Sequence, residues 1–280
     1  SVASGSGGCL PIAVFTGTSN VTFGSVGCTN GNSYDPLWQQ AYPVSTWGKN
    51  FGFVPFSGYP NGNPYRVLAS EDNTNIFLNG AFVANINAGD IYPAAFTNTP
   101  ALLNTATLIS ADKPVCVAQY AQRNACSGNG NTQGDPDMVL LNPIEQNISD
   151  ISIFSSTNQA ITQQYVNILV KTAAIPSFLI NGAAPIIPAR GTWQTSANLP
   201  GYSFIRYSLA GYTAARLVSD SGFNAIAYGW GANESYAYSA GTNVIDLYQQ
   251  IGVATEYGNE PNYFDCYRVR LHQITGSVRT

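Results

Sequence analysis

The residues with the clearest binding chemistry in this sequence are aromatic. Trp38 and Trp47 lie in a loop-rich segment, and Trp230, Tyr236 and Tyr238 follow an apolar run in the last third of the chain. Exposed aromatic rings are the side chains that lectin-like surfaces and protein interfaces use. We therefore predict that these five residues bind the ligand. The alternative is that they fill the core of a β-sandwich, since such cores also consume aromatic rings.

Two carboxylates raise the question of a metal. Asp135 and Asp137 lie in the segment GNGNTQGDPD. Carboxylate oxygens bind calcium, so the sequence brings a calcium ion into consideration at these two residues. The segment is not a complete calcium-binding loop, however, and Asp in such turns also hydrogen-bonds its own backbone. Calcium binding and turn capping both stay open, and no other cofactor is predicted.

Catalytic groups are scarce. The chain has a single histidine, His272, and no G-x-S-x-G motif, so a Ser-His-Asp triad has no support. Several carboxylates are available for glycosidase chemistry, but no pattern identifies a catalytic pair among them: Glu71, Asp72, Asp135, Asp137 and Glu234. We predict that the chain is not an enzyme, with a carbohydrate hydrolase as the third-ranked hypothesis.

The cysteines indicate an oxidising compartment. None has CxxC spacing, which together with the single histidine argues against zinc: Cys9, Cys28, Cys116, Cys126 and Cys266. Cys116 lies in an apolar run and Cys126 in the glycine-rich loop after it, while Cys9 and Cys28 bracket an equivalent run and loop. We predict the disulfides Cys116–Cys126 and Cys9–Cys28, which leaves Cys266 over. The prediction implies an extracellular or cell-surface protein, and five thiols in a reducing compartment are the alternative.

Composition limits both the fold and the partners. Only 9% of the residues are charged, against about 25% in typical globular proteins. The net charge of −4 includes no run of either sign, which argues against nucleic acid as a partner. No apolar stretch reaches the roughly 18 residues that cross a bilayer, so we expect no membrane insertion. The many Val, Ile, Thr, Tyr and Phe residues favour strands, and we predict an all-β fold.

The sequence also repeats itself after roughly a hundred residues. DPLWQQAYPVSTW begins at Asp35 and DPDMVLLNPIEQN at Asp135, and LISADKPV from Leu108 aligns with LVSDSGFN from Leu217. The strand after Lys113 also resembles LPIAVFTG near the start of the chain. We predict two tandem, jelly-roll-like β-sandwich modules that arose by internal duplication. The predicted units are residues 10–113, residues 114–243 and a C-terminal extension or linker, residues 244–280.

A pair of Asn-Gly dipeptides marks equivalent points of the two copies. Asn79-Gly80 ends one apolar run and Asn181-Gly182 ends the other. Asn-Gly is the strongest short-range signal for a tight hairpin, because both residues tolerate positive φ. Each pair therefore predicts a hairpin turn.

A set of motifs in a fixed order resembles the N-terminal domain of IgGFc-binding proteins. The motifs are IAVFTG, PVSTWGK, ASEDNT with LNG, SADKPV and ESYAY, and the resemblance runs from about Leu10 to Asn243. It is greatest to the copies carried by large secreted or surface proteins of gliding bacteria. The resemblance implies a non-catalytic unit of an extracellular protein, and it identifies no residue that contacts Fc.

These observations lead to two main functional hypotheses. The first is a non-enzymatic adhesion or binding module that recognises a glycan or a protein. The second is a structural subunit of an extracellular filament or sheath, in which copies exchange β-strands or terminal arms.

Overall fold

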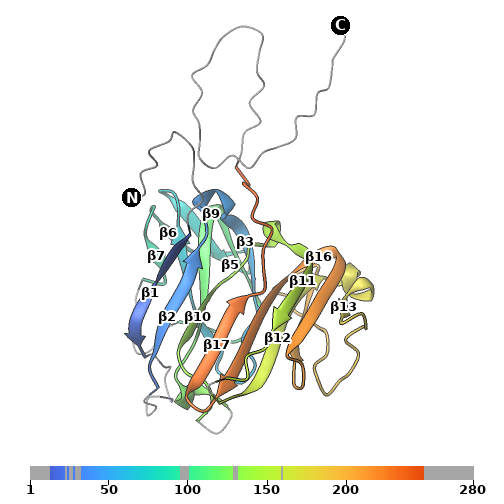
Figure 1. Cartoon of the computed structure of the whole chain (residues 1–280). Coiled ribbons are helices and arrows are strands. Elements are labelled where there is room, and N and C mark those ends of the chain that lie inside the picture. Colours follow the sequence, from blue (N-terminus) through green and yellow to red (C-terminus); the bar gives the residue numbers. More distant parts are fainter. Residues whose placement is uncertain are drawn as a thin grey trace, which may run out of the picture.

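The protein is built almost entirely of β-strands. The computed structural model describes residues 13–22, 24, 28, 33–94, 101–128, 132–158 and 160–248. Antiparallel sheets make up this part of the chain, and its helices are four short 3-10 turns: η1 (Val44–Thr46), η2 (Asn124–Cys126), η3 (Ile144–Gln146) and η4 (Thr172–Ser177). The all-β sandwich predicted from composition is confirmed (Figure 1).

The first sheet has eight strands arranged around one long strand. Its strands are β3 (Gly48–Phe53), β4 (Asn63–Ala69), β5 (Thr74–Leu78), β6 (Ala81–Ile86), β7 (Ile91–Tyr92), β8 (Leu102–Leu103), β9 (Thr107–Ala121) and β10 (Asp137–Leu140). The start of β9 pairs with β3 and β5, whereas its end pairs with β4 and β10. The partners change near Pro114, which has no N–H to give to a ladder.

The second sheet has seven strands and a similar plan. Its strands are β11 (Ile148–Phe154), β12 (Ile161–Lys171), β13 (Leu179–Ile180), β14 (Gln194–Thr195), β15 (Tyr202–Ser208), β16 (Ala214–Gly231) and β17 (Glu234–Ser239). The start of β16 pairs with β11 and β13, and its end pairs with β12 and β17. The partners change around Gly222, which has a φ of 71°. The tandem duplication nevertheless stays a prediction.

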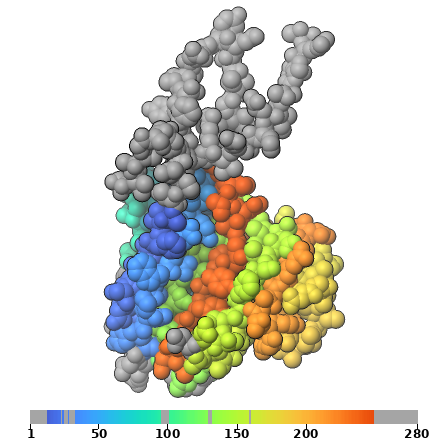
Figure 2. Space-filling model, viewed as in Figure 1, coloured from blue at the N-terminus to red at the C-terminus, as the bar shows by residue number. Residues whose placement is uncertain are grey.

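A two-stranded sheet covers part of the first sheet. It consists of β1 (Val14–Val21) and β2 (Asp35–Ala41). Leu37 of β2 packs with Ala118 and Tyr120 of β9, and β2 also contacts β10. Figure 2 shows β1 and β2 in blue on one side of a face that also carries the red β17.

The largest hydrophobic cluster takes side chains from both large sheets. Phe51 and Phe53 of the first sheet belong to the same cluster as Tyr228 and Trp230 of the second. A further cluster lies within the second sheet, around Phe178 and Phe223. The two sheets therefore share one core, and the predicted module boundary at residues 113 and 114 falls inside β9.

Both Asn-Gly pairs form the predicted turns. The φ angles are 53° and 81° at Asn79 and Gly80, and 51° and 79° at Asn181 and Gly182. Each Asn side chain also accepts a hydrogen bond from the long strand, at 3.0 Å from the Leu108 N–H for Asn79 and at 2.8 Å from the Arg216 N–H for Asn181. The first turn leads into β6, but the second closes with a single bridge, between Ile180 and Ala183.

The predicted disulfide pairing is wrong. Cys28 is bonded to Cys126, across a sequence separation of 98 residues, and Cys116 is a free thiol. Cys28 lies between β1 and β2, and Cys126 lies between β9 and β10, so the bond joins the connection of the β1–β2 hairpin to that of the β9–β10 hairpin. Cys116 points away from this bond because it alternates with Val115 and Val117, which face the core. Cys9 and Cys266 lie outside the described residues.

We expect the turn glycines to be sensitive to β-branched side chains. An added Cβ at Gly80 or Gly182 would meet no atom within 4 Å, so any cost comes from the backbone conformation alone. Gly80→Val should lower the free energy of unfolding by about 1–3 kcal/mol, measured by urea denaturation. Gly80→Asn is the matched control and should cost much less, because Asn tolerates positive φ. Equal costs for the two variants would contradict the turn assignment.

Peptide mapping without reductant should find Cys28 joined to Cys126 and Cys116 unpaired. Removing the bond with Cys28→Ser and Cys126→Ser should lower the free energy of unfolding by about 2–5 kcal/mol, because the bond closes a long loop in the unfolded chain. Cys116→Ala is the control, and its peptide map should keep the Cys28–Cys126 bond. A map that pairs Cys116 with Cys126 would refute the assignment.

Candidate binding surfaces

Trp230 is a core residue and not an exposed ligand-binding ring. Its side chain is 1% exposed, and its ring Nε1–H donates a 2.8 Å hydrogen bond to the Ser57 carbonyl. The ring packs edge-on against Phe56 and Tyr59. The alternative interpretation of the sequence, that these aromatic rings fill the core of a β-sandwich, is therefore correct for Trp230.

Tyr236 and Tyr238 lie next to each other but are partly buried. Their rings stack with centroids 6.1 Å apart. The Tyr238 hydroxyl accepts a 2.8 Å hydrogen bond from the Phe154 N–H and donates a 2.7 Å bond to the Phe154 carbonyl. These two hydrogen bonds connect β17 to the end of β11, so Tyr238 has a structural role.

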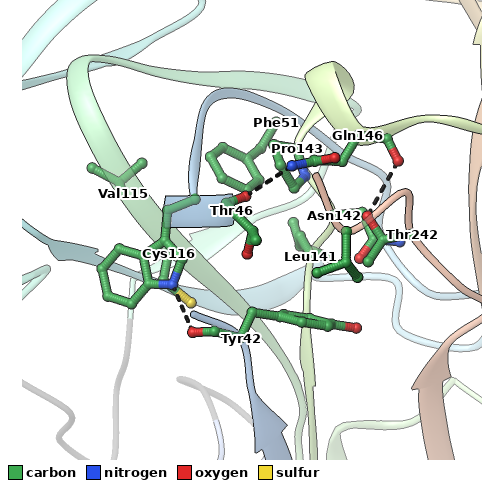
Figure 3. A pocket seen from close by; sticks show the side chains of 12 residues that line it. Tyr42, Thr46, Phe51, Val115, Cys116, Leu141, Asn142, Pro143, Gln146 and Thr242 are labelled. Carbon is green, nitrogen blue, oxygen red and sulfur yellow. Dashed lines mark hydrogen bonds between the residues drawn. The ribbon is translucent and has the colours of Figure 1, made fainter. Parts of the chain in front are cut away.

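Trp47 also makes internal contacts. Its Nε1–H donates a 3.2 Å hydrogen bond to the Tyr42 carbonyl, and its ring lines a cavity of about 20 Å³. Figure 3 shows Thr46, Gln146 and Thr242 around this cavity, which has room for about one water molecule. Gln146 binds the carbonyls of Thr46 and Ile245, so the chain after β17 is held against η1 and η3.

Trp38 is the predicted ring with the most open surroundings. It is 60% exposed on β2, and on the same face of the hairpin Phe15 of β1 is 61% exposed. The structure therefore brings Tyr236 and Tyr238 together, leaves Trp38 on the surface and Trp47 half-buried, and places Trp230 in the core.

Asp135 and Asp137 belong to an acidic corner and not to a recognisable metal site. In the described part of the chain, no group of three or more His, Cys, Asp or Glu side chains has the geometry to hold a metal ion. Asp135 accepts a short hydrogen bond from the Ser235 hydroxyl and lies in the field of Asp35, Asp137 and Glu234. Calcium binding at Asp135 and Asp137 thus stays a prediction without support from this geometry.

Burial governs the protonation of this corner. Burial, and to a smaller extent the charges of neighbouring carboxylates, raise the pKa of Asp135 to about 8 and that of Asp137 to about 7. Burial, with the charge of Glu234, raises the pKa of Asp35 to about 6. Because these groups can carry protons at neutral pH, they pack together at the ends of β2 and β10 without full mutual repulsion.

Sequence reasoning missed a largely apolar groove beside β1. The groove has a volume of about 450 Å³. Thr16 and Thr18 of β1 and Leu37 of β2 form one wall. The other wall is mainly apolar and includes one charged residue, Arg66, beside Leu68, Ile91, Cys116, Ala118, Tyr120, Met138 and Leu140. The groove exists because β1 and β2 cover only part of the outer face of the first sheet. A signal was present in the alternating residues of β9, where Cys116, Ala118 and Tyr120 share the face opposite the core.

The edge of β1 next to this groove is open. Within the described ranges, β1 pairs with β2 and with no other strand. Its sequence VFTGTSNV contains no charged residue, and its side chains are exposed along nearly the whole strand. An uncharged, exposed edge presents free backbone N–H and C=O groups to an incoming strand.

Lowering the pH from about 8 to about 5 should stabilise the protein through the acidic corner. Between these values the folded state holds protons on Asp135 and Asp137 that the unfolded chain releases, so the free energy of unfolding falls as pH rises. Thermal melts should show this slope, and Asp135→Asn should flatten it and raise the melting temperature at about pH 8.

The control for this experiment is Asp112→Asn. Hydrogen bonds from the Asn75 backbone and side chain hold the pKa of Asp112 below its usual value. Asp112 therefore stays ionised across the same pH range, and its substitution should leave the slope unchanged. A slope that survives Asp135→Asn intact would show that the acidic corner is not its source.

Comparison with known proteins gives a family but no close relative. The model of the family described as IgGFc binding protein matches residues 2–229. No curated protein and no solved structure matches the chain. No helix in the described ranges is long and apolar enough to cross a membrane. The match and the disulfide indicate an extracellular binding module. Since the match covers most of its length, the chain belongs to the IgGFc-binding protein family.

Proposed function

We propose that this chain is a non-enzymatic extracellular module that binds a protein ligand by pairing an extended segment of that ligand with β1. The observation that carries the proposal is the open edge of β1 beside an apolar groove. Strand addition of this kind takes its affinity from backbone hydrogen bonds and its specificity from pockets for alternate side chains. Membership of a family named for binding IgG Fc supports a protein as the ligand.

The two faces of β1 would select the ligand sequence. A strand added to the open edge continues the alternation of β1, so every second side chain enters the groove and the others face solvent. Leu68, Met138 and Leu140 in the groove favour apolar side chains at the inward positions. On the outward face, Phe15 and Trp38 offer exposed rings to the remaining positions.

A library of random peptides displayed on phage, with purified IgG Fc tested beside it, examines this proposal. Selected peptides should alternate apolar and polar residues. Thr18→Lys places an ammonium group on the groove side of β1 and should weaken binding of the selected peptides by about tenfold or more, roughly 1.4 kcal/mol, because the charge loses water and the charged residue in the lining, Arg66, repels it.

The matched control is Gln40→Lys, which adds the same charge to the outward face of the hairpin, opposite Phe15. This variant should bind the selected peptides within about twofold of the parent protein, roughly 0.4 kcal/mol. Failure to select any peptide, or equal losses from Thr18→Lys and Gln40→Lys, would overturn the proposal.

The same edge favours a second candidate function, that of a self-assembling structural subunit. An uncharged open edge accepts a strand from another copy as readily as one from a foreign protein. The low content of charged residues, 9%, also reduces repulsion between copies. Electron microscopy of the purified protein distinguishes the two, because uniform filaments would support assembly and separate particles would support the binding module.

A further inference from the structure

A polar cleft lies on a different part of the molecule from β1. It has a volume of about 450 Å³, which falls within the range of small-molecule sites, about 300–1,000 Å³. The loop between β3 and β4 forms one wall, and the segment before β14 together with β15 forms the other. The lining residues whose side chains carry polar atoms are Ser57, Tyr59, Thr192, Gln194 and Arg206.

The first wall of the cleft is held in place by the core. The Ser57 N–H donates a 2.9 Å hydrogen bond to the Tyr228 hydroxyl, and the Ser57 carbonyl accepts a 2.8 Å bond from Trp230. The Gly58 carbonyl accepts a 2.7 Å bond from the Gly128 N–H. The backbone of this wall is therefore fixed before any ligand arrives.

The second wall is equally constrained. Gly191 has a φ of 146°, and an added Cβ would lie 2.5 Å from the Arg206 carbonyl oxygen, so only glycine allows this segment to lie so close to β15. The Ser208 N–H donates a 2.6 Å hydrogen bond to the Arg190 carbonyl, and the Arg190 side chain binds the Ser208 and Ala210 carbonyls. Two rigid walls give a cleft that requires little ordering on binding.

Arg206 supplies an unsatisfied positive charge in this cleft. The side chain is half-buried and forms no hydrogen bond or ion pair with any described residue. Among the described residues the only ion pair joins Arg216 to Asp150, and no carboxylate lines the cleft. A guanidinium group carries five N–H donors in a planar fork that fits a carboxylate or sulfate group.

The neutral groups around Arg206 indicate the rest of the ligand. Thr192 and Gln194 offer a hydroxyl and an amide, which donate to and accept from hydroxyl groups. Phe56 and Tyr59 are almost fully buried, so the cleft offers little aromatic surface of the kind that anchors protein partners. A polyhydroxylated ring that carries one negative charge satisfies this lining best.

We propose that this cleft binds an acidic saccharide, with its carboxylate or sulfate on Arg206 and its ring hydroxyls on Thr192 and Gln194. This site is separate from the open edge of β1 and does not depend on strand addition there. Ion pairing with a partly buried guanidinium provides the selectivity for acidic over neutral sugars.

Titration followed by NMR tests the cleft with three probes: methyl glucuronide, methyl glucoside and acetate. Methyl glucuronide should bind about tenfold or more tightly than methyl glucoside, which has the same ring without the charge, and than acetate, which has the charge without the ring. Tenfold corresponds to roughly 1.4 kcal/mol. Equal binding of the two sugars, equal binding of acetate, or no binding of the glucuronide would overturn the proposal.

Variants locate the site. Arg206→Gln should weaken glucuronide binding about tenfold or more, whereas Lys171→Gln, which removes an exposed charge at the end of β12, should leave it unchanged. Thr192→Val keeps the charge and should also weaken glucuronide binding, so it tests the site if Arg206→Gln does not fold. Unchanged binding in both cleft variants would contradict the proposal. Peptide binding at β1 should survive Arg206→Gln, so the two proposals fail separately.

Discussion

The packing of the two large sheets depends on how Tyr228 and Trp230 of the second sheet bind Ser57, in the loop between β3 and β4 of the first. Ser57 is half-buried beside a hydrophobic cluster, where a backbone N–H or carbonyl without a partner costs free energy. The two aromatic side chains bind both groups, and the Tyr228 hydroxyl also donates a 2.8 Å hydrogen bond to Asn167. Both rings thus join the sheets through polar contacts as well as burial, and the loop after β3 keeps one conformation.

This shared core decides which surfaces remain for function. Rings that look suitable for a ligand are used internally, because a core between two sheets needs large side chains from both. Open surface remains in two places. One is the edge of β1, which has no second neighbour among the described strands. The other is the cleft beside Arg206, where the two walls leave space between them. Both places are rigid on the side of the core, so the specificity of each comes from a few side chains and not from loop rearrangement.

Local chemistry in the sequence predicts the turns well and the long-range contacts poorly. Asn79-Gly80 and Asn181-Gly182 require positive φ wherever they lie, so the dipeptides alone identify both turns. The alignment of Leu108 with Leu217 is one residue out, since Leu78 pairs with Ile109 and Ile180 pairs with Leu217. Both alignments place similar apolar residues together, but a slip of one residue exchanges the two faces of a strand. Only the pairing partner decides the face, and that partner is distant in the sequence.

The cysteine pairing is a second long-range contact that the local sequence does not predict. Each of Cys28 and Cys126 follows the first strand of a hairpin, so a pairing within one strand and its loop is the natural local inference. The bond instead joins the β1–β2 hairpin to the distant β9–β10 hairpin. Leu37 packs on Ala118 and Tyr120, which brings the β1–β2 hairpin over β9 and its loop toward the loop after β9. The disulfide fixes that placement at one end of the hairpin, while the far edge of β1 stays open. The covalent bond and the groove are thus two results of one packing contact, that of a short two-stranded sheet on a broader one.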